Sequence, residues 1–473
     1  MAHFPRRAAV LVVVVLASAG RPIAAQNLAV TGATIIDGTG RAPIADGVIV
    51  IRNGKVTAVG PAATVAIPGD VTRVDARGKW VIPGMMDANL HLDLNINLEH
   101  LILFEDQYDK IVLEGAQIAL KTGQTTVFDT WGPRAALIKV RDQINAGQAE
   151  GARIYLAGNI IGFSGPLGPD FIAPAAAWVT KSFAKRINET WEQGTGRALL
   201  WMPPDTLRAA IRKYTGLGVD FLKFGGSGHQ DMDFLTFSPR QEQVIVEEGH
   251  RAGMTVQAHV TSPESIDMAV DAGVDILTHG SISGPVYPIQ PATIRKIVEK
   301  GVGVSVLGLT KRAMAAQQKA DSTSVLLPYM KMAAENIRNL SRAGALLMVS
   351  TDAGVDDPIR VADSRTLVSD SVDSRTKLGE GHFNALTVFE EAGMAPMEIL
   401  KTVTSNVAKA YKLDKELGTL EPGKAGDLVI LDANPLEAAR NYRRIGSVIK
   451  GGRVMNLAAL PTAPVISSRK PRS

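Results

Sequence analysis

The chain of 473 residues contains no cysteine. Disulfide bonds, thiolate metal ligands and lipid attachment through a cysteine are therefore excluded. Aromatic residues are also scarce, at 5% of the chain, while 45% of the residues are hydrophobic and 21% are charged. This composition is ordinary for a globular protein, and the length allows a large buried core.

The chain has neither a strong net charge nor a long hydrophobic run. Its formal net charge is +4, and Arg6, Arg7 and Arg21 supply three of those charges, so the remainder carries only +1. Such a balance gives no reason to expect nucleic acid as a partner. The apolar run at residues 8–20 is shorter than the about 20 residues that span a bilayer. We therefore expect no stable membrane span once the N-terminal segment has been processed.

Residues 1–25 have the three parts of a secretory signal peptide. A basic start is followed by a short apolar core and by small residues at Ala24-Ala25. We therefore expect cleavage after Ala25 and export of the mature chain, to the periplasm if the source is a Gram-negative bacterium. An anchor that is not cleaved is the alternative.

Both ends of the mature chain have a β-like texture. Residues 28–80 alternate short apolar runs with turns, and Asn53-Gly54 between two such runs predicts a hairpin. Residues 418–436 and 445–455 have the same texture. Since either end alone would expose an apolar face, we predict one composite β-sandwich domain from residues 26–80 and 412–460. Residues 461–473 are rich in Pro, Ser and basic side chains, and we predict a disordered tail there.

The central region alternates short apolar runs with helical patterns. The predicted strands are residues 81–91, 125–131, 153–162, 219–225, 254–260, 274–279, 303–308 and 346–352. Proline opens several of the helical stretches, such as 239–252 and 263–272, and proline suits the first turn of a helix. Eight β/α units across residues 81–411 predict an α/β fold, a (β/α)8 TIM barrel. The largest insertion, residues 163–204, carries three of the five tryptophans and is predicted to cover the substrate.

Polar side chains stand at the carboxyl ends of the predicted strands, where a TIM barrel places its active site. They are Asn89 and His91 on strand one, Lys223 on strand four, His259 on strand five, His279 on strand six and Asp352 on strand eight. Because strand side chains alternate between faces, Asn89 and His91 project the same way. A lysine inside an apolar strand is costly unless its charge is changed or paired. Histidine nitrogens at two neighbouring strand ends suit zinc or a similar ion.

Three segments resemble the amidohydrolase superfamily. Residues 83–91 read Pro-Gly-Met-Met-Asp-Ala-Asn-Leu-His, similar to the first barrel strand of that superfamily, Pro-Gly-x-x-Asp-Ala-His-x-His. Residues 418–435, GTLEPGKAGDLVILDANP, resemble the return strands of members that carry a β-sandwich. Lys223 together with Phe-Ser-Pro-Arg at 237–240 resembles the branch of imidazolonepropionase-like hydrolases and Xaa-Pro dipeptidases.

The resemblance implies two divalent metal ions, with zinc expected, and a catalytic role for two residues. The buried metal would have Asn89, His91, Lys223 and Asp352, and the outer metal Lys223, His259 and His279. Lys223 would react with CO₂ to form a carbamate that bridges both ions. Asp352 would take a proton from the attacking water.

Asn89 departs from the superfamily pattern, which has histidine there. A neutral amide oxygen is a weaker donor to zinc than imidazole, so the buried metal could bind loosely, be a different ion or be absent. Relatives that hydrolyse phenylureas and thiocarbamates also carry Asn-x-His, which slightly favours urea- or carbamate-like substrates. Two further histidines are candidates for substrate contact, His229 in the Gly-rich loop after strand four and His382 after the strand-eight loop. Loop surface is the alternative for His229.

We therefore expect an exported, metal-dependent amidohydrolase that cleaves an amide-type C–N bond in a small molecule. The bond could belong to an amide, peptide, urea or carbamate. A single-metal hydrolase, a lactonase or a deaminase of the same fold is the alternative. A non-catalytic exported binding protein is less consistent with the sequence, because Lys223, His259, His279 and Asp352 are all present. The sequence does not fix the substrate, the metal or the oligomeric state, and it is compatible with a homo-oligomer.

Overall fold

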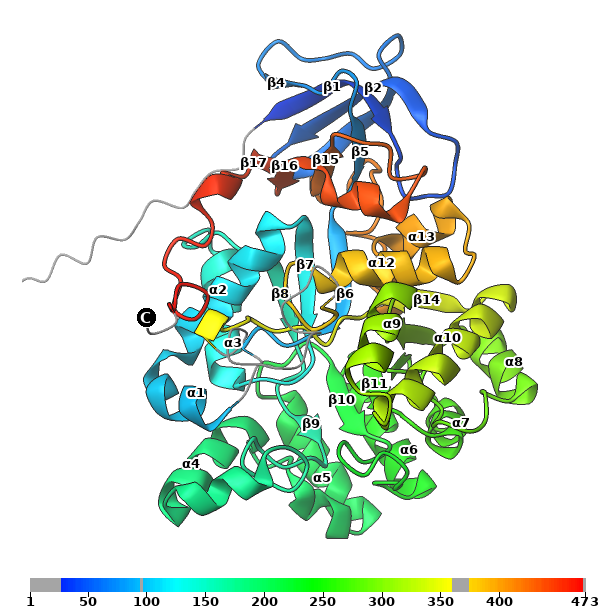
Figure 1. Cartoon of the computed structure of the whole chain (residues 1–473). Coiled ribbons are helices and arrows are strands. Elements are labelled where there is room, and N and C mark those ends of the chain that lie inside the picture. The colour runs from blue at the N-terminus through cyan, green and yellow to red at the C-terminus, as the bar shows by residue number, and fades with distance from the viewer. Residues whose placement is uncertain (1–26, 94–96, 360–373, 471–473) are drawn as a thin grey trace, which may run out of the picture.

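The computed structural model describes residues 27–93, 97–359 and 374–470. The expected signal peptide lies outside these ranges. The chain has a mixed α/β architecture in which strands from both ends form a sheet above a set of parallel strands and helices (Figure 1). Within the described ranges, no helix combines the length and apolar character needed to cross a membrane.

The two ends of the chain meet in one eight-stranded sheet. Its strands are β1 (Leu28–Ile35), β2 (Ile44–Arg52), β3 (Lys55–Pro61), β4 (Thr72–Asp75), β5 (Trp80–Pro83), β15 (Leu428–Leu431), β16 (Ile445–Lys450) and β17 (Arg453–Val454). The junction between the ends is the antiparallel pairing of β15 with β5, in which Leu428 lies opposite Pro83. The sheet is therefore a composite of both termini.

The predicted hairpin at Asn53-Gly54 is confirmed. These residues join β2 to β3, and Arg52 pairs with Lys55 across the turn. Asn53 and Gly54 have φ values of 50° and 77°, as a two-residue turn between twisted strands requires.

The central strands are parallel and lie in two sheets. One contains β6 (Met85–Leu90), β7 (Gln124–Asp129) and β8 (Arg153–Leu156); the other contains β9 (Ile160–Ile161), β10 (Leu222–Gly225), β11 (Val256–His259), β12 (Ile276–Thr278), β13 (Gly303–Val306) and β14 (Leu346–Val349). Each lies within a predicted strand, except that β7 begins one residue before the predicted range 125–131. The third predicted strand is interrupted between β8 and β9, where the Tyr214 hydroxyl donates to the Ala157 carbonyl and accepts from the Asn159 N–H. Past β14, the N–H groups of Thr351 and Asp352 donate to the Asn89 carbonyl, which joins the two sheets.

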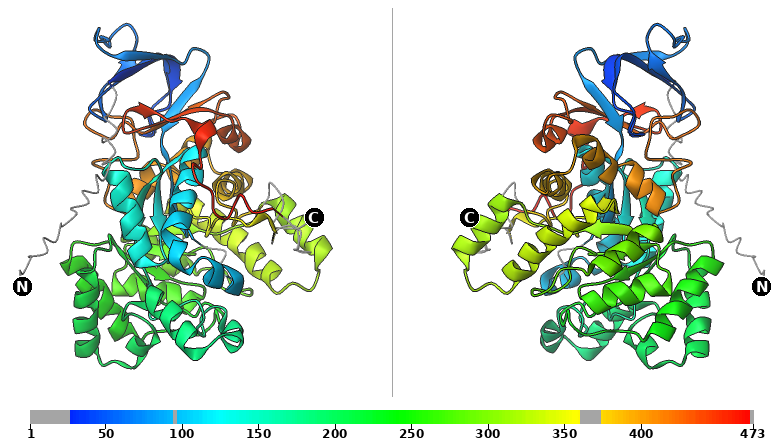
Figure 2. Two further views of the ribbon diagram at one scale, coloured as in Figure 1. Left: turned by 90° about the vertical axis from the view of Figure 1, so that its left-hand side faces the viewer. Right: turned by 90° about the vertical axis from the view of Figure 1, so that its right-hand side faces the viewer.

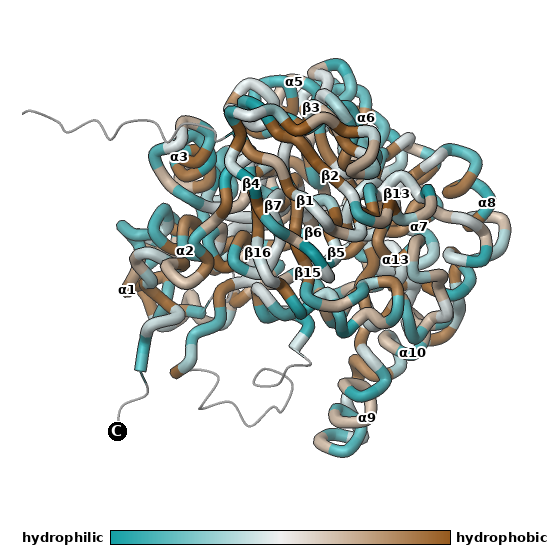
Figure 3. The backbone as a smooth tube through the Cα atoms, turned by 90° about the horizontal axis from the view of Figure 1, so that it is seen from above, coloured by the Kyte–Doolittle hydropathy of each residue, from teal (hydrophilic) through white to brown (hydrophobic). Residues whose placement is uncertain are grey.

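Helices cover the parallel strands. They are α1 (Leu98–Leu103), α2 (Tyr108–Lys121), α3 (Arg134–Asn145), α4 (Lys181–Glu192), α5 (Pro204–Thr215), α6 (Pro239–Arg251), α7 (Pro263–Ala272), α8 (Pro291–Glu299), α9 (Lys311–Ala320), α10 (Leu326–Arg342), α12 (Gly381–Glu391), α13 (Pro396–Thr402) and α14 (Ser405–Ala410). Proline opens α5 to α8, as the sequence predicts for two of them. The helices α9 and α10 extend from the side of the body (Figure 2). The hydrophobic residues concentrate in the strands rather than on the outer helices (Figure 3).

The insertion at residues 163–204 folds as α4 with short 3-10 turns η2 (Ala173–Trp178) and η3 (Arg197–Trp201). It lies at the end of the parallel strands opposite the terminal sheet (Figure 1). Trp191 is fully buried and meets the ring of Tyr108 edge-on, so its role is packing. Trp178 and Trp201 are 83% and 88% exposed.

The segment expected to be a disordered tail packs against α2 over residues 461–470. The buried Glu114 carboxylate accepts hydrogen bonds from three consecutive backbone N–H groups, those of residues 465–467, at 2.7–2.9 Å. Arg469 forms ion pairs with Asp357 and Glu99. The expectation of disorder differs from the structure because composition alone does not reveal a buried carboxylate that binds the backbone of the segment.

Candidate active site

The residues predicted from strand ends come together at the carboxyl end of the parallel strands. Asn89 lies on β6, His91 directly after it, Lys223 on β10, His259 on β11, His279 after β12 and Asp352 after β14. Asn89 and His91 both contact Asp352, as the alternation of side chains in a strand requires. All six side chains belong to one connected group.

Asp352 is the centre of this group. Its Oδ1 accepts a hydrogen bond from Asn89 Nδ2 at 3.0 Å and lies 3.0 Å from His91 Nε2 and 3.8 Å from His279 Nε2. Burial raises the pKa of Asp352, but its interactions with His279, His91 and Lys223 more than offset burial and hold the pKa well below its usual range. Asp352 is therefore ionised at neutral pH.

Lys223 is buried, with 1% of its surface exposed. Its Nζ donates to Asn89 Oδ1 at 3.0 Å and to Thr130 Oγ1 at 3.1 Å. Burial lowers the pKa of Lys223 from 10.5 to about 8. Thr130 is not among the residues predicted from the sequence, although it follows β7 at the same end of the strands.

Asn89 is the hydrogen-bonding link between Lys223 and Asp352. Its amide nitrogen donates to Ser350 at 3.1 Å as well as to Asp352, and its amide oxygen accepts from Lys223 and Thr130. For Asn89 to bind a metal through this oxygen, these two hydrogen bonds must be replaced.

The orientation of His91 follows from its backbone partner. Its Nδ1 lies 3.0 Å from the carbonyl oxygen of Trp131, and a carbonyl can only accept, so Nδ1 carries the proton. The other nitrogen, Nε2, is thereby aimed at Asp352. The Trp131 carbonyl is a second contact that the sequence did not reveal.

His259 and His279 present nitrogens that have no hydrogen-bond partner among the described residues. Their rings meet edge-on with centroids 4.8 Å apart. Both ring nitrogens of His259 and Nδ1 of His279 are buried and unpaired. Burial lowers the pKa of both groups, for His279 to about 3, so both imidazoles are neutral. Unpaired buried donors and acceptors are costly, and they indicate a missing partner.

The donor types fit divalent metal ions. Neutral imidazole nitrogens and a carboxylate are the ligands that zinc takes in proteins, and the unpaired nitrogens of His259 are free to bind one. Across the described ranges, no three or more His, Asp or Glu side chains are already grouped at the geometry of a metal site. The fit therefore rests on donor chemistry and on the unpaired nitrogens.

Two of these residues have a left-handed backbone. His279 and Asp352 have φ values of 61° and 58°, which are uncommon outside glycine. Such conformations cost of the order of 1–3 kcal/mol each and persist where the surroundings enforce them. The strain at these two strand ends is consistent with a functional constraint on where both side chains point.

The structure brings His229 to the site and keeps His382 away from it. The ring of His229 lies 5.8 Å from that of His259, and its Nδ1 donates to the Asp170 carbonyl at 2.8 Å. His382 is buried and bonds the Thr122 carbonyl, which precedes β7 and so lies at the opposite end of the strands. The expectation that His382 faces the site is wrong, because the start of a helix in the sequence does not tell where its side chains point.

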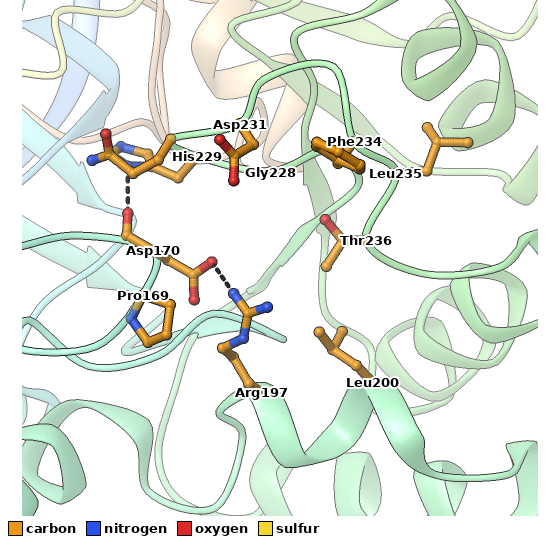
Figure 4. Close-up of a pocket in the computed structure, with 11 residues that line it drawn as sticks. Pro169, Asp170, Arg197, Leu200, Gly228, His229, Asp231, Phe234, Leu235 and Thr236 are labelled. Carbon is orange, nitrogen blue, oxygen red and sulfur yellow. Dashed lines mark hydrogen bonds and ion pairs between the residues drawn. The ribbon is translucent and has the colours of Figure 1, made fainter. Parts of the chain in front are cut away.

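A pocket of about 350 Å³ lies next to His229 (Figure 4). The insertion supplies Asp170 and Arg197 on one side, and the loop after β10 supplies Asp231 and Phe234 on the other. None of the three insertion tryptophans lines this pocket. Phe171, also from the insertion, packs 4.7 Å from the ring of His229 instead.

Comparison with known proteins shows the family of the chain. The pattern of the Amidohydrolase family matches residues 80–455. The solved structure of molinate hydrolase is 35% identical, with a TM-score of 0.90 over 95% of this chain and 99% of that one. Phenylurea hydrolase B is 33% identical, with a TM-score of 0.89 over 94% and 100% of the two chains. The ochratoxinase of Aspergillus niger is 25% identical over 444 residues, 89% of this chain and 85% of that protein.

The chain belongs to the amidohydrolase family and is a hydrolase. The resemblance carried by residues 83–91 and 418–435 is thereby confirmed.

Proposed function

We propose that this protein is an exported, metal-dependent amidohydrolase that cleaves an amide-type C–N bond in a small molecule, with an amide, urea or carbamate as substrate. The observation that carries the proposal is the meeting of Lys223, His259, His279 and Asp352 at one end of the parallel strands. The similarity to molinate hydrolase and phenylurea hydrolase B supports urea- and carbamate-like substrates over peptides.

We also propose that the two parallel sheets close into a (β/α)8 barrel and that the terminal sheet is part of a sandwich. The hydrogen bonds from Thr351 and Asp352 to the Asn89 carbonyl support closure on one side. The short gap between β8 and β9, which belong to one continuous segment, supports it on the other.

The proposed metal ligands are those of the sequence analysis. Asn89, His91, Lys223 and Asp352 would hold the buried ion, and Lys223, His259 and His279 the outer one. A divalent ion held there supplies Lewis acidity, which polarises a carbonyl and lowers the pKa of water. Lys223 as a carbamate and ionised Asp352 would together place two negative charges in a buried site, and bound cations would offset them.

The residues of the chain have separable tasks in this proposal. Asp352, which is ionised before the reaction begins, takes the proton of the attacking water and passes it to the leaving nitrogen. Asn89 Nδ2 holds its carboxylate by donating to Oδ1, and His91 Nε2 lies 3.0 Å from the same oxygen. His229, neutral because burial lowers its pKa, keeps its proton on Nδ1 toward the Asp170 carbonyl, so its Nε2 can accept a hydrogen bond from the substrate.

The experiment is hydrolysis of matched amides, ureas, carbamates and esters by purified protein, before and after removal of metal with a chelator. We expect amine release from the C–N substrates, loss of activity on chelation and recovery with Zn²⁺. Asp352→Asn should reduce kcat by at least about a hundredfold, the range for a general acid–base group. The exposed Asp414→Asn is the matched control and should have no effect.

Product analysis separates the alternatives. Release of ammonia from a ring amine would indicate a deaminase, and ester cleavage without amide cleavage would indicate a lactonase. Metal content per chain distinguishes one bound ion from two. Full activity after complete chelation, or in Asp352→Asn, would refute the proposal.

A further inference from the structure

The pocket beside His229 has two different walls (Figure 4). Leu200 of the insertion and Phe234 and Leu235 of the loop after β10 form an apolar part. Phe234 is 67% exposed and Leu235 is 43% exposed. Large apolar side chains held open to water beside a cavity gain stability when a ligand covers them, so this part suits an apolar substituent.

The polar part of the pocket carries an unbalanced negative charge. Arg197 Nη1 lies 2.7 Å from Asp170 Oδ1, so these two charges neutralise each other. Asp170 is fixed in place, since its Oδ2 also accepts from the backbone N–H of Ser164 at 2.8 Å. Asp231 is exposed to the pocket and has no ion-pair partner within the ranges that the structure describes. The pocket therefore has one net negative charge.

The pocket adjoins the candidate active site through one side chain. His229 lines it, and the ring of His229 lies 5.8 Å from that of His259. A substrate whose scissile bond lies at His259 and Asp352 can therefore extend a substituent past His229 into the pocket. Its volume, about 350 Å³, accommodates one substituted aromatic ring.

We infer that this pocket binds the apolar substituent of the substrate, and that the unpaired Asp231 makes it select neutral or cationic groups over carboxylates. The inference rests on the proposed function of the same site. A carboxylate in the pocket would lie a few ångströms from Asp231 in partly solvated surroundings. Repulsion there weakens binding on the order of tenfold.

The test compares two ligands that differ only in charge, acetanilide and 4-acetamidobenzoate. Their dissociation constants are measured by calorimetry with Asp352→Asn protein, in which turnover is slow. Asp231→Asn in that background should tighten binding of 4-acetamidobenzoate about tenfold and leave acetanilide within about twofold. Asp233→Asn is the matched control, because Asp233 is exposed nearby but does not line the pocket. Phe234→Ser should weaken binding of both ligands.

Two outcomes for the charged residues would overturn the inference, and a third concerns Phe234. One is an unchanged ratio of the two dissociation constants in Asp231→Asn, and the other is an equal change in Asp233→Asn. Unchanged affinities in Phe234→Ser would exclude the apolar wall as part of the binding site. Hydrolysis of acetanilide by the parent protein is measured separately, so that failure of the proposed function does not obscure the binding result.

Discussion

The depressed pKa of Lys223 makes a quantitative prediction about its reaction with CO₂. Only the neutral amine reacts, giving a carbamate and a proton. Burial lowers the pKa from 10.5 to about 8, so the neutral fraction at pH 7 rises from about 0.03% to about 10%, roughly 300-fold. At constant dissolved CO₂, the rate of carbamate formation should therefore rise about tenfold per pH unit below pH 8 and level off above it.

The assay begins with protein stripped of metal and CO₂ at mildly acidic pH. Zn²⁺ and a fixed concentration of dissolved CO₂ are added at a series of pH values, and recovery of hydrolysis is followed over time. Labelling with ¹³CO₂ and carbon NMR reports the carbamate directly. Lys223→Ala should be inactive and unlabelled, with partial rescue by acetate or propionate.

Lys450 provides a matched control. It lies on β16 of the terminal sheet, and burial lowers its pKa to about 8 as well. In the sequence it is far from the residues of the candidate site. Lys450→Gln should leave the CO₂ dependence unchanged. Recovery that needs no CO₂, or a rate that keeps rising to pH 10, would falsify the reasoning about Lys223.

Four further predictions concern other parts of the chain. Asn89→Ala should lose metal and turnover together, whereas Asn89→His should hold the buried metal more tightly against chelators; an alanine variant with full metal content and rate would show that Asn89 is no ligand. Glu242 is buried with both carboxyl oxygens unpaired, and burial raises its pKa to about 8. The stability that its protonated form contributes is therefore lost as the pH rises from 4.5 through 8. Glu242→Gln should stabilise the fold by about 2–4 kcal/mol at pH 8 but not at pH 4. Glu248 on the same helix has the opposite shift, because hydrogen bonds from arginines lower its pKa to about 2. Glu248→Gln should therefore destabilise the fold by about 1–3 kcal/mol at pH 7, and this effect should disappear as the pH falls from 4.5 through 2. Unfolding temperatures measured against pH check the sign of both effects. Protein recovered after export should begin near Gln26, and an intact Met1 would contradict cleavage.

The strand-end residues could be predicted because the period of a β-strand fixes which side chains share a face. That rule places Asn89 and His91 together, and the expected TIM barrel places Lys223, His259 and Asp352 at the same end of the strands. The hairpin at Asn53-Gly54 was equally predictable, since few residues adopt its positive φ values.

Contacts between distant segments could not be read from the sequence. Thr130 and the Trp131 carbonyl are part of the site only because β7 lies beside β6, and nothing in their own segment marks that role. The direction of His382 depends on how α12 packs, which helical periodicity does not determine. The Glu114 carboxylate binds a segment more than 300 residues away in the sequence.

The ion pairs of Arg469 bear on how the chain folds during synthesis. Arg469 joins Asp357, five residues past Asp352, to Glu99 on α1, the helix that follows β6. Consider a nascent chain that has emerged from the ribosome only as far as β17. It already contains every strand of both parallel sheets, but Asp357 in its loop after β14 has no Arg469 to pair with. The carboxylate of Asp357 can therefore gain its ion pair with Arg469 only after residues 461–470 have been made, so we expect this contact to form after the sheets.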